Sequence, residues 1–474
     1  MCLLLLLVSC GVGPGLSPTG AKIDDSSSTN LSEGDKEEAT STASSGEGIL
    51  QSAYDDHGGD GLVDVEDSFP NDLNEFQDNG TGGGGFGDNS DAYSNDASEF
   101  VSRKLASGKN HACLLKSNGT IWCWGDNAYG QLGNGDLGTD SNIPVLVSTG
   151  ARLFKDLFGG SLADSSCAID VDGYAWCWGR NQHGQLGDNS TTNRDVPVLL
   201  EDSVTYSSIA LSGWPEGDVG ADKSHSCGLR TDGVTTCWGD DSVFQLGTQS
   251  GGQVDMLVPD PIAGTNILFD RLAVGYSHSC GLMADNRGFC WGDNQQGANG
   301  DGTNSTKFQP TEIPTLTFKG ISAATWYTCA VGTDGFAYCF GDNFHGYLGN
   351  GGGPFANQVS PVRVTQNSDS QDVTDVDLIS AGGTHACAVK TDGSAHCWGR
   401  NTEGQLGDGA NTSTTRSVPA TGAHAFKSIS TGYYHSCAMR VSDEAVLCWG
   451  KNDQGQLGDG NSPTNTNAPV VISE

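Results

Sequence analysis

Fourteen of the sixteen cysteines in this 474-residue chain form seven pairs, and each pair recurs within the same short sequence pattern. Six pairs are separated by ten residues and the last by eleven, and successive pairs begin 49 to 60 residues apart. The pairs are Cys113 with Cys123, Cys167 with Cys177, Cys227 with Cys237, Cys280 with Cys290, Cys329 with Cys339, Cys387 with Cys397 and Cys437 with Cys448. A unit of about fifty residues that returns seven times predicts a repeat architecture built from stacked supersecondary units.

Between the cysteines of each pair, two short apolar runs flank a turn. The turn reads Asn118-Gly119 in the first repeat, and Asp-Gly occupies the same place in four others. This pattern predicts a β-hairpin, because glycine readily supplies the positive φ that such tight turns need. The cysteines lie symmetrically about the turn, so we expect them to face each other on adjacent antiparallel strands.

Facing cysteines allow two interpretations: seven disulfides that staple the hairpins, or fourteen reduced cysteines that fill a core. We favour disulfides, because the N-terminus indicates export and disulfides persist in oxidising compartments. A metal array is disfavoured, since each pair lacks a second pair of ligands at the spacing of a zinc site.

Each hairpin is followed by a loop, which spans Trp124–Gly133 in the first repeat and ends in Gly-Gln-Leu-Gly. A polar stretch then leads to a proline and a β-branched run, such as Pro144–Val147. Proline at the start of a strand suits an outer edge strand. Each repeat therefore offers about four short strands, which predicts one blade of a β-propeller.

These motifs resemble the repeat of the regulator of chromosome condensation family. The resemblance rests on the Gly-x-x-His-x-Cys start (Gly108, His111, Cys113), the Asp-Gly hairpin, the Cys-Trp-Gly strand end and the Asn-x-x-Gly-Gln-Leu-Gly loop. It covers residues 101–474 and implies an all-β, seven-bladed β-propeller. We also predict that the C-terminal strand at 469–472 pairs beside the first blade and closes the ring, so that no sheet edge is left unpaired.

Histidine and tryptophan also recur at fixed repeat positions. A ring of histidines could hold a metal or act as a proton switch, but we favour a structural hydrogen bond within each histidine's own blade. We expect the tryptophans to pack between blades. The histidines are His111, His225, His278, His385 and His435, and the tryptophans are Trp124, Trp178, Trp238, Trp291, Trp398 and Trp449.

The first ten residues resemble a lipoprotein signal peptide. Leu7-Val8-Ser9-Cys10 is similar to a bacterial lipobox, in which Cys10 would be lipidated, and multiple acyl chains anchor a protein stably. We therefore expect an outer-membrane lipid-anchored or secreted protein of the bacterial cell envelope. A signal peptide normally has a basic residue before its apolar run, and this sequence has none. A misassigned start or a fortuitous apolar segment is therefore the alternative.

Residues 11–100 carry 20 Asp and Glu but only two Lys and no Arg. This composition predicts a disordered acidic tether. Within it, residues 55–91 resemble a thrombospondin type-3 calcium repeat, with Asp56, Asp60, Asp64 and Asp67 as the ligands that the resemblance implies, since calcium prefers clustered oxygen ligands. Glycine stands where further carboxylates belong, so a plain acidic linker is the alternative.

No nucleophile elbow, phosphate loop or metalloprotease motif occurs in the sequence. The net charge of −35 disfavours nucleic acid as a partner. We therefore expect a monomeric, non-catalytic exported propeller that binds a protein or a surface glycan through its inter-blade loops, with no cofactor in the propeller. The family resemblance implies two alternatives: a guanine-nucleotide exchange factor for a small GTPase, and a secreted propeller that inhibits an enzyme.

Overall fold

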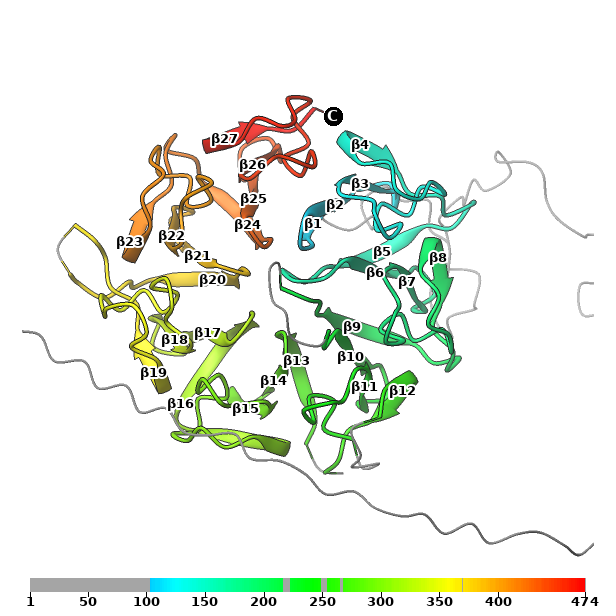
Figure 1. Ribbon diagram of the computed structural model, residues 1–474, viewed down its shortest axis with the longest axis horizontal. Coiled ribbons are helices and arrows are strands. Elements are labelled where there is room, and N and C mark those ends of the chain that lie inside the picture. The colour runs from blue at the N-terminus through cyan, green and yellow to red at the C-terminus, as the bar shows by residue number, and fades with distance from the viewer. Residues whose placement is uncertain (1–102, 216–221, 249–253, 265–266, 369, 474) are drawn as a thin grey trace, which may run out of the picture. The chain divides into compact units, whose positions relative to one another are not determined.

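The computed structural model describes residues 103–215, 222–248, 254–264, 267–368 and 370–473. All regular structure in these residues is β-strand, and seven four-stranded blades follow one another around a central axis (Figure 1). The predicted all-β, seven-bladed propeller is confirmed. The described part of the chain contains no helix long and apolar enough to cross a membrane.

Within every blade the strands run in chain order from the axis outward as an antiparallel meander (Figure 1). Blade 1 contains β1 (Lys104–Ser107), β2 (His111–Leu115), β3 (Ile121–Gly125) and β4 (Ser141–Leu146). Blade 2 contains β5 (Phe154–Phe158), β6 (Ser165–Asp170), β7 (Ala175–Gly179) and β8 (Arg194–Leu199). Blade 3 contains β9 (Tyr206–Leu211), β10 (His225–Arg230), β11 (Thr235–Gly239) and β12 (Met256–Pro261).

Blades 4 and 5 share one long strand. The first part of β16 (Lys307–Ala323) pairs with β15 as the outer strand of blade 4, and its last residues pair with β17 as the inner strand of blade 5. The other strands of these blades are β13 (Phe269–Val274), β14 (His278–Met283), β15 (Arg287–Gly292), β17 (Tyr327–Gly332), β18 (Ala337–Gly341) and β19 (Gln358–Arg363).

The last two blades repeat the plan of the first three. Blade 6 contains β20 (Val376–Ala381), β21 (His385–Lys390), β22 (Ala395–Gly399) and β23 (Thr414–Pro419). Blade 7 contains β24 (Phe426–Thr431), β25 (His435–Arg440), β26 (Val446–Gly450) and β27 (Thr466–Val471).

The hydrophobic core is divided into seven parts, one between each pair of adjacent blades. Between blades 1 and 2, for example, Cys113, Cys123 and Leu132 of blade 1 pack against Trp178 of blade 2. Trp178 is fully buried, and its indole Nε1 donates to the Gln131 carbonyl at 2.9 Å. The predicted packing of the tryptophans between blades is confirmed.

The prediction for ring closure is wrong. The C-terminal strand β27 pairs with β26 of its own blade, and blade 1 already has its own outer strand, β4. The described part of the propeller therefore begins with an inner strand and ends with an outer one, so within it no strand is left over to cross the joint. Blades 7 and 1 meet instead as the other blades do: Ser107 N donates to Ser430 Oγ at 2.8 Å, and Trp124 packs against the disulfide face of blade 7.

Candidate functional site

Disulfide bonds join all seven predicted cysteine pairs, each across the second and third strands of its blade. They link Cys113 to Cys123, Cys167 to Cys177, Cys227 to Cys237, Cys280 to Cys290, Cys329 to Cys339, Cys387 to Cys397 and Cys437 to Cys448. The paired Cα atoms lie 4.0 to 4.1 Å apart, the short separation typical of a non-hydrogen-bonded antiparallel pair. Every one of these cysteines is at most 1% exposed. The disulfides therefore belong to the cores between blades and present no reactive surface.

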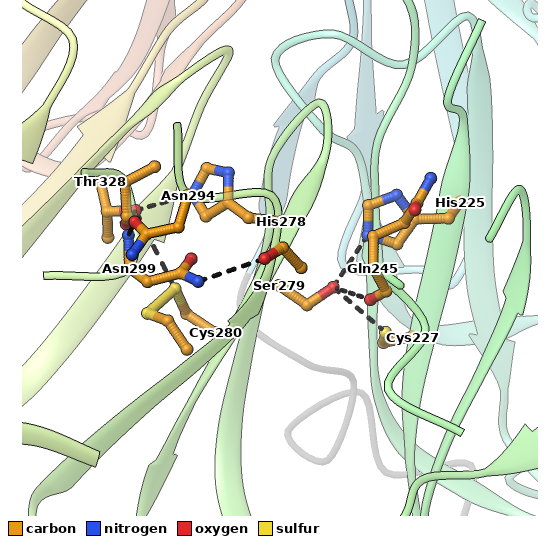
Figure 2. Close-up of a disulfide and its surroundings, with 12 residues drawn as sticks. His225, Cys227, Gln245, His278, Ser279, Cys280, Asn294, Asn299 and Thr328 are labelled. Atoms are coloured by element: carbon orange, nitrogen blue, oxygen red, sulfur yellow. Dashed lines mark hydrogen bonds between the residues drawn. A yellow bond between two sulfur atoms is a disulfide. The ribbon is translucent and has the colours of Figure 1, made fainter. Parts of the chain in front are cut away.

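Four of the five recurring histidines form hydrogen bonds across the blade interfaces. Figure 2 shows His225 of blade 3, whose Nε2 lies 2.8 Å from Ser279 Oγ of blade 4. Ser279 Oγ in turn donates to the Gln245 carbonyl of blade 3 at 2.8 Å. The hydroxyl partner thus lies in the next blade. The expected bond within the histidine's own blade is present at His225, whose Nδ1 lies 3.2 Å from the Lys223 carbonyl. It is wrong for the other four described histidines of this position, whose Nδ1 atoms have no hydrogen-bond partner.

The same cross-blade contact joins four interfaces, with Nε2–Oγ distances of 2.7 to 2.8 Å. The pairs are His111 with Ser166, His225 with Ser279, His278 with Thr328 and His385 with Ser436. Burial lowers the pKa of His225 to about 4, so its ring is neutral at ordinary pH. A neutral, fully enclosed imidazole with a hydroxyl partner is a structural group, and four of the five recurring histidines are of this kind. His435 is equally buried but has no hydroxyl partner. Among the described residues, none of the five belongs to a group of side chains placed to share a metal ion.

The loops nearest the axis lie together on one surface of the propeller. In blade 1, Ser107 lies opposite Ala112 and His111 lies opposite Gly125, so the connection between the first two strands and the loop after the third strand reach the same face. We call this face, which recurs in every blade, the loop face. The hairpin turns such as Asn118-Gly119 lie on the opposite face, which we call the hairpin face.

An aromatic cluster lies on the loop face. Its members come from the connection between the first and second strands of five different blades, and such residues can meet only near the axis. The cluster contains Leu162, Trp214, Tyr276, Trp326, Tyr433 and Tyr434. The Tyr276 and Trp326 rings lie 5.8 Å apart, edge to face. Trp214, Trp326 and Tyr434 are half-buried, so part of each ring reaches solvent.

Cationic side chains cover several of these rings. The Arg180 guanidinium lies 5.4 Å from the Trp214 ring centre, and the Lys223 ammonium lies 5.6 Å from that of Tyr276. The Arg400 guanidinium lies 4.7 Å from the Tyr434 ring. These separations are typical of cation–π contacts. The loop face therefore combines aromatic rings with cationic side chains.

Carboxylates interleave with these cations. Arg180 lies 2.6 Å from Asp222 and 3.5 Å from Asp164. Burial is the largest influence on Asp164 and raises the pKa of its carboxyl despite the two cations beside it, Lys109 and Arg180. Burial likewise raises the pKa of Asp126 to about 6. The face thus carries charges of both signs at low solvent exposure, where pairwise electrostatics are strong.

A narrow cavity of about 170 Å³ follows the axis. Its walls are the inner strands of six blades, with residues such as Ser107, Ala273, Ser380 and Thr431, and the segment that follows the inner strand of blade 2, which includes Gly160. These are mainly small side chains and backbone groups. Among the described residues that line it there is no titratable side chain, and its polar side chains are serine and threonine hydroxyls.

The remaining predicted sites lie outside the described residues. These are the lipidation site Cys10 and the calcium ligands Asp56, Asp60, Asp64 and Asp67. Sequence reasoning also missed the aromatic cluster. Its signal was present just before the repeat position of the recurring histidine, where Tyr276 precedes His278 and Trp326 precedes Tyr327, which replaces the histidine in that repeat.

A closed ring of four-stranded blades, with a buried aromatic side chain at each interface and an imidazole hydrogen bond at four of them, defines a seven-bladed β-propeller built from sequence repeats. Two models of the regulator of chromosome condensation (RCC1) repeat match the chain. One matches residues 103–131, 269–298, 376–405 and 426–456, and the other matches 118–160, 172–213, 334–389, 392–439 and 443–474. The chain belongs to the RCC1 repeat family.

Relatives in sequence include eukaryotic proteins. The ultraviolet-B receptor UVR8 of Arabidopsis thaliana is 27% identical over 376 residues, which cover 78% of this chain and 81% of that protein. The ubiquitin ligase HERC2 of Homo sapiens is 28% identical over 216 residues, or 45% of this chain, but these span only 4% of HERC2. The propeller is thus shared with proteins of unlike activity.

Solved structures agree on the fold. Prp20p of Saccharomyces cerevisiae superposes with a TM-score of 0.63 at 21% identity, covering 76% of this chain and 87% of that one. Human WBSCR16 superposes with a TM-score of 0.63 at 16% identity, covering 75% and 94%. At these identities the likeness supports the propeller architecture and leaves the function to be argued from the loop face.

Proposed function

We propose that this protein is a non-catalytic binding propeller that docks a protein partner on its loop face. The observation that carries the proposal is the aromatic cluster, which brings side chains from five blades together at one place on the surface. Trp, Tyr and Arg are the residues that most often dominate the energy of protein–protein interfaces. The cluster and its covering cations supply all three types.

A protein partner fits this surface better than a glycan does. Sugar binding on aromatic residues needs the flat face of a ring free for stacking. Here the faces of Trp214, Tyr276 and Tyr434 are approached by Arg180, Lys223 and Arg400. Aromatic rings combined with charged side chains are typical of a protein interface.

We place this binding activity in the bacterial cell envelope, with Cys10 lipidated and residues 11–100 acting as a tether that contains the calcium-like segment. The N-terminal sequence supports this placement. Nucleotide exchange on a small GTPase is the second candidate, since Prp20p, which has the same fold, has binding properties toward Gsp1p and histones. Enzyme inhibition would be one specific form of the proposed protein binding.

The test is site-specific photo-crosslinking on intact protein in the native host's envelope fraction. A photoreactive benzoylphenylalanine replaces Trp326 on the loop face or, as the matched control, Val171 beside a hairpin turn, which is 40% exposed. We expect a discrete crosslinked protein from position 326 only. Equal crosslinking at both positions, or crosslinking at position 171 alone, would contradict docking on the loop face.

The identified partner then allows the affinity to be measured directly. Trp326→Ala is expected to weaken binding at least tenfold, as for a central aromatic anchor, while Val171→Ala leaves it unchanged. If the partner is a small GTPase and the propeller accelerates release of a fluorescent nucleotide from it, the exchange function replaces simple binding.

A further inference from the structure

We propose a divalent transition-metal site between blades 2 and 3, formed by His183, Asp240 and Asp255. One ligand atom from each of the three side chains lies within 4.8 Å of the others. His183 Nδ1 is 2.8 Å from Asp255 Oδ2 and 3.8 Å from Asp240 Oδ2. Ligands that share one metal at about 2.1 Å are separated by similar distances.

Asp240 is held ready to ligate by its surroundings. Its Oδ1 accepts hydrogen bonds from Ser242 N, from Ser242 Oγ and from the Gln245 side-chain amide. These three donors orient the carboxylate and leave Oδ2 directed toward His183. Supporting hydrogen bonds of this kind are what fix ligands in protein metal sites.

Asp255 departs from the role that its position has in other blades. At this position, just before the outer strand, a side-chain oxygen usually accepts a bond from the backbone N–H of the preceding loop in the same blade. The pairs are Asn127 with Asp140, Asn181 with Asn193, Asn343 with Asn357, Asn401 with Ser413 and Asn452 with Asn465. In the described part of blade 3, Asp255 makes no such bond with Asp241 N and turns its carboxylate to His183 of blade 2.

Equivalent positions at other interfaces are closed by a different contact. Asn465 Nδ2 of blade 7 donates to Glu403 Oε2 of blade 6 at 2.8 Å, where these residues correspond to Asp255 and His183. An amide donor satisfies that acceptor without any ion. Between blades 2 and 3 an imidazole nitrogen instead faces two carboxylates, which is a set of metal ligands.

The chemistry of the three ligands selects the ion. One imidazole nitrogen and two carboxylate oxygens suit Zn²⁺ or Mn²⁺ better than Ca²⁺, which prefers oxygen alone. Two carboxylates and a neutral imidazole also balance a divalent charge. On the other side of the ring, Asp222 Oδ2 lies 3.6 Å from His183 Nε2 and 2.6 Å from Arg180. A carboxylate therefore also faces the ring nitrogen that does not face Asp240 and Asp255. His183 and Asp255 are 25% and 39% exposed, which leaves room for water or a partner's side chain to complete the coordination.

The experiment titrates the purified full chain, cleared of metal with a chelator, with Zn²⁺ and separately with Mn²⁺. Calorimetry gives the affinity, and the pulsed electron spin-echo spectrum of bound Mn²⁺ detects a nitrogen ligand. Because the acidic N-terminal segment could also bind metal, the decisive quantity is the difference between wild type and His183→Gln, Asp255→Asn, and the double variant. The matched control is Glu403→Gln at the equivalent contact of blades 6 and 7.

We expect one site with a nitrogen ligand in wild type and in Glu403→Gln. His183→Gln should lose the nitrogen signal and weaken this site at least tenfold, and Asp255→Asn should weaken it with the signal retained. Asp255→Asn is a near-isosteric change at a part-exposed residue and so should fold. Metal binding that is the same in wild type, His183→Gln and Asp255→Asn would overturn the proposal and leave a plain His–Asp contact. No partner protein is used, so the outcome is independent of the proposed function.

Discussion

The cross-blade hydrogen bonds make a quantitative prediction at Ser279. In Ser279→Ala, His225 Nε2 and the Gln245 carbonyl each lose a bond of 2.8 Å. All three residues are fully buried, so water cannot replace the hydroxyl. Two lost hydrogen bonds at about 1 kcal/mol each, plus about 1 kcal/mol for stranding a buried ring nitrogen, lower the free energy of unfolding by about 3 kcal/mol.

Thermal unfolding followed by tryptophan fluorescence measures this loss. For a propeller spanning residues 103–473, a change of about 3 kcal/mol corresponds to a Tm lower by about 4 °C, since unfolding entropy scales with chain length. Ser436→Ala removes the equivalent bonds, to His385 Nε2 and the Gln405 carbonyl, and should match it. The control is the exposed Ser442→Ala. If Ser279→Ala were no less stable than this control, the cross-blade hydrogen bonds would contribute nothing.

Three further predictions concern the same interfaces. In blade 1 the hydroxyl position is occupied by Ala112, and neither ring nitrogen of His435 makes a hydrogen bond; Ala112→Ser should therefore raise Tm by about 1 °C in the same assay. The pKa of buried His111 is about 3, so below pH 6.5 the unfolded state binds its proton and the folded state does not; the stability from the neutral ring is complete above pH 6.5 and is lost as pH falls. Between pH 6.5 and pH 5.5, the free energy of unfolding measured in urea should fall by about 1 kcal/mol less in His111→Asn than in wild type. Alkylation of denatured protein from the envelope fraction should find the fourteen paired cysteines blocked before reduction and free after it.

The sequence predicts most of this fold because each repeat is locally complete. The spacing of Cys113 and Cys123 about Asn118-Gly119 fixes the hairpin and its register, which the structure confirms. The hydrogen-bond partner of His111 was not predictable, because the sequence does not show whether a residue at a repeated position faces its own blade or the next one. Its Ser166 partner lies 55 residues away in the next blade. The prediction for ring closure failed for the same reason, because the sequence does not reveal whether the last strand completes its own blade or pairs with the first blade.

The site was less predictable than the fold, because it is made from positions at which repeats differ. The repeat positions of Tyr276, Trp326 and Tyr434 hold different residue types in different blades. Nothing in the spacing of the repeats shows that five blades bring such residues to one place. His183 and Asp255 are 72 residues apart and belong to different blades. A repeat pattern predicts what the copies share, whereas the aromatic cluster and the proposed metal site depend on what they do not share.

Asp241 shows how such a departure affects stability. In other blades this position is Asn, as at Asn181, whose side chain accepts from Leu186 N and donates to the Ser190 and Thr192 carbonyls. Asp241 keeps the first contact, with Leu246 N at 3.0 Å, but an ionised carboxylate cannot donate. Burial, with repulsion from nearby carboxylates, raises its pKa to about 6.

Asp241→Asn should therefore stabilise the propeller, and by an amount that depends on pH. The folded-state pKa of Asp241 lies above the usual 3.8, so the folded state is penalised for ionising it, and the penalty is complete only above pH 6. In chelator, the variant should gain about 2 kcal/mol in urea unfolding at pH 7.5 and almost nothing at pH 4. An equal gain at both pH values would show that the lost amide donor, and not the carboxylate charge, sets the cost at this position. No gain in the free energy of unfolding at either pH would mean that the charge of the Asp241 carboxylate is already neutralised in blade 3. A cation bound at Asp240 and Asp255 that the chelator failed to remove would have this effect.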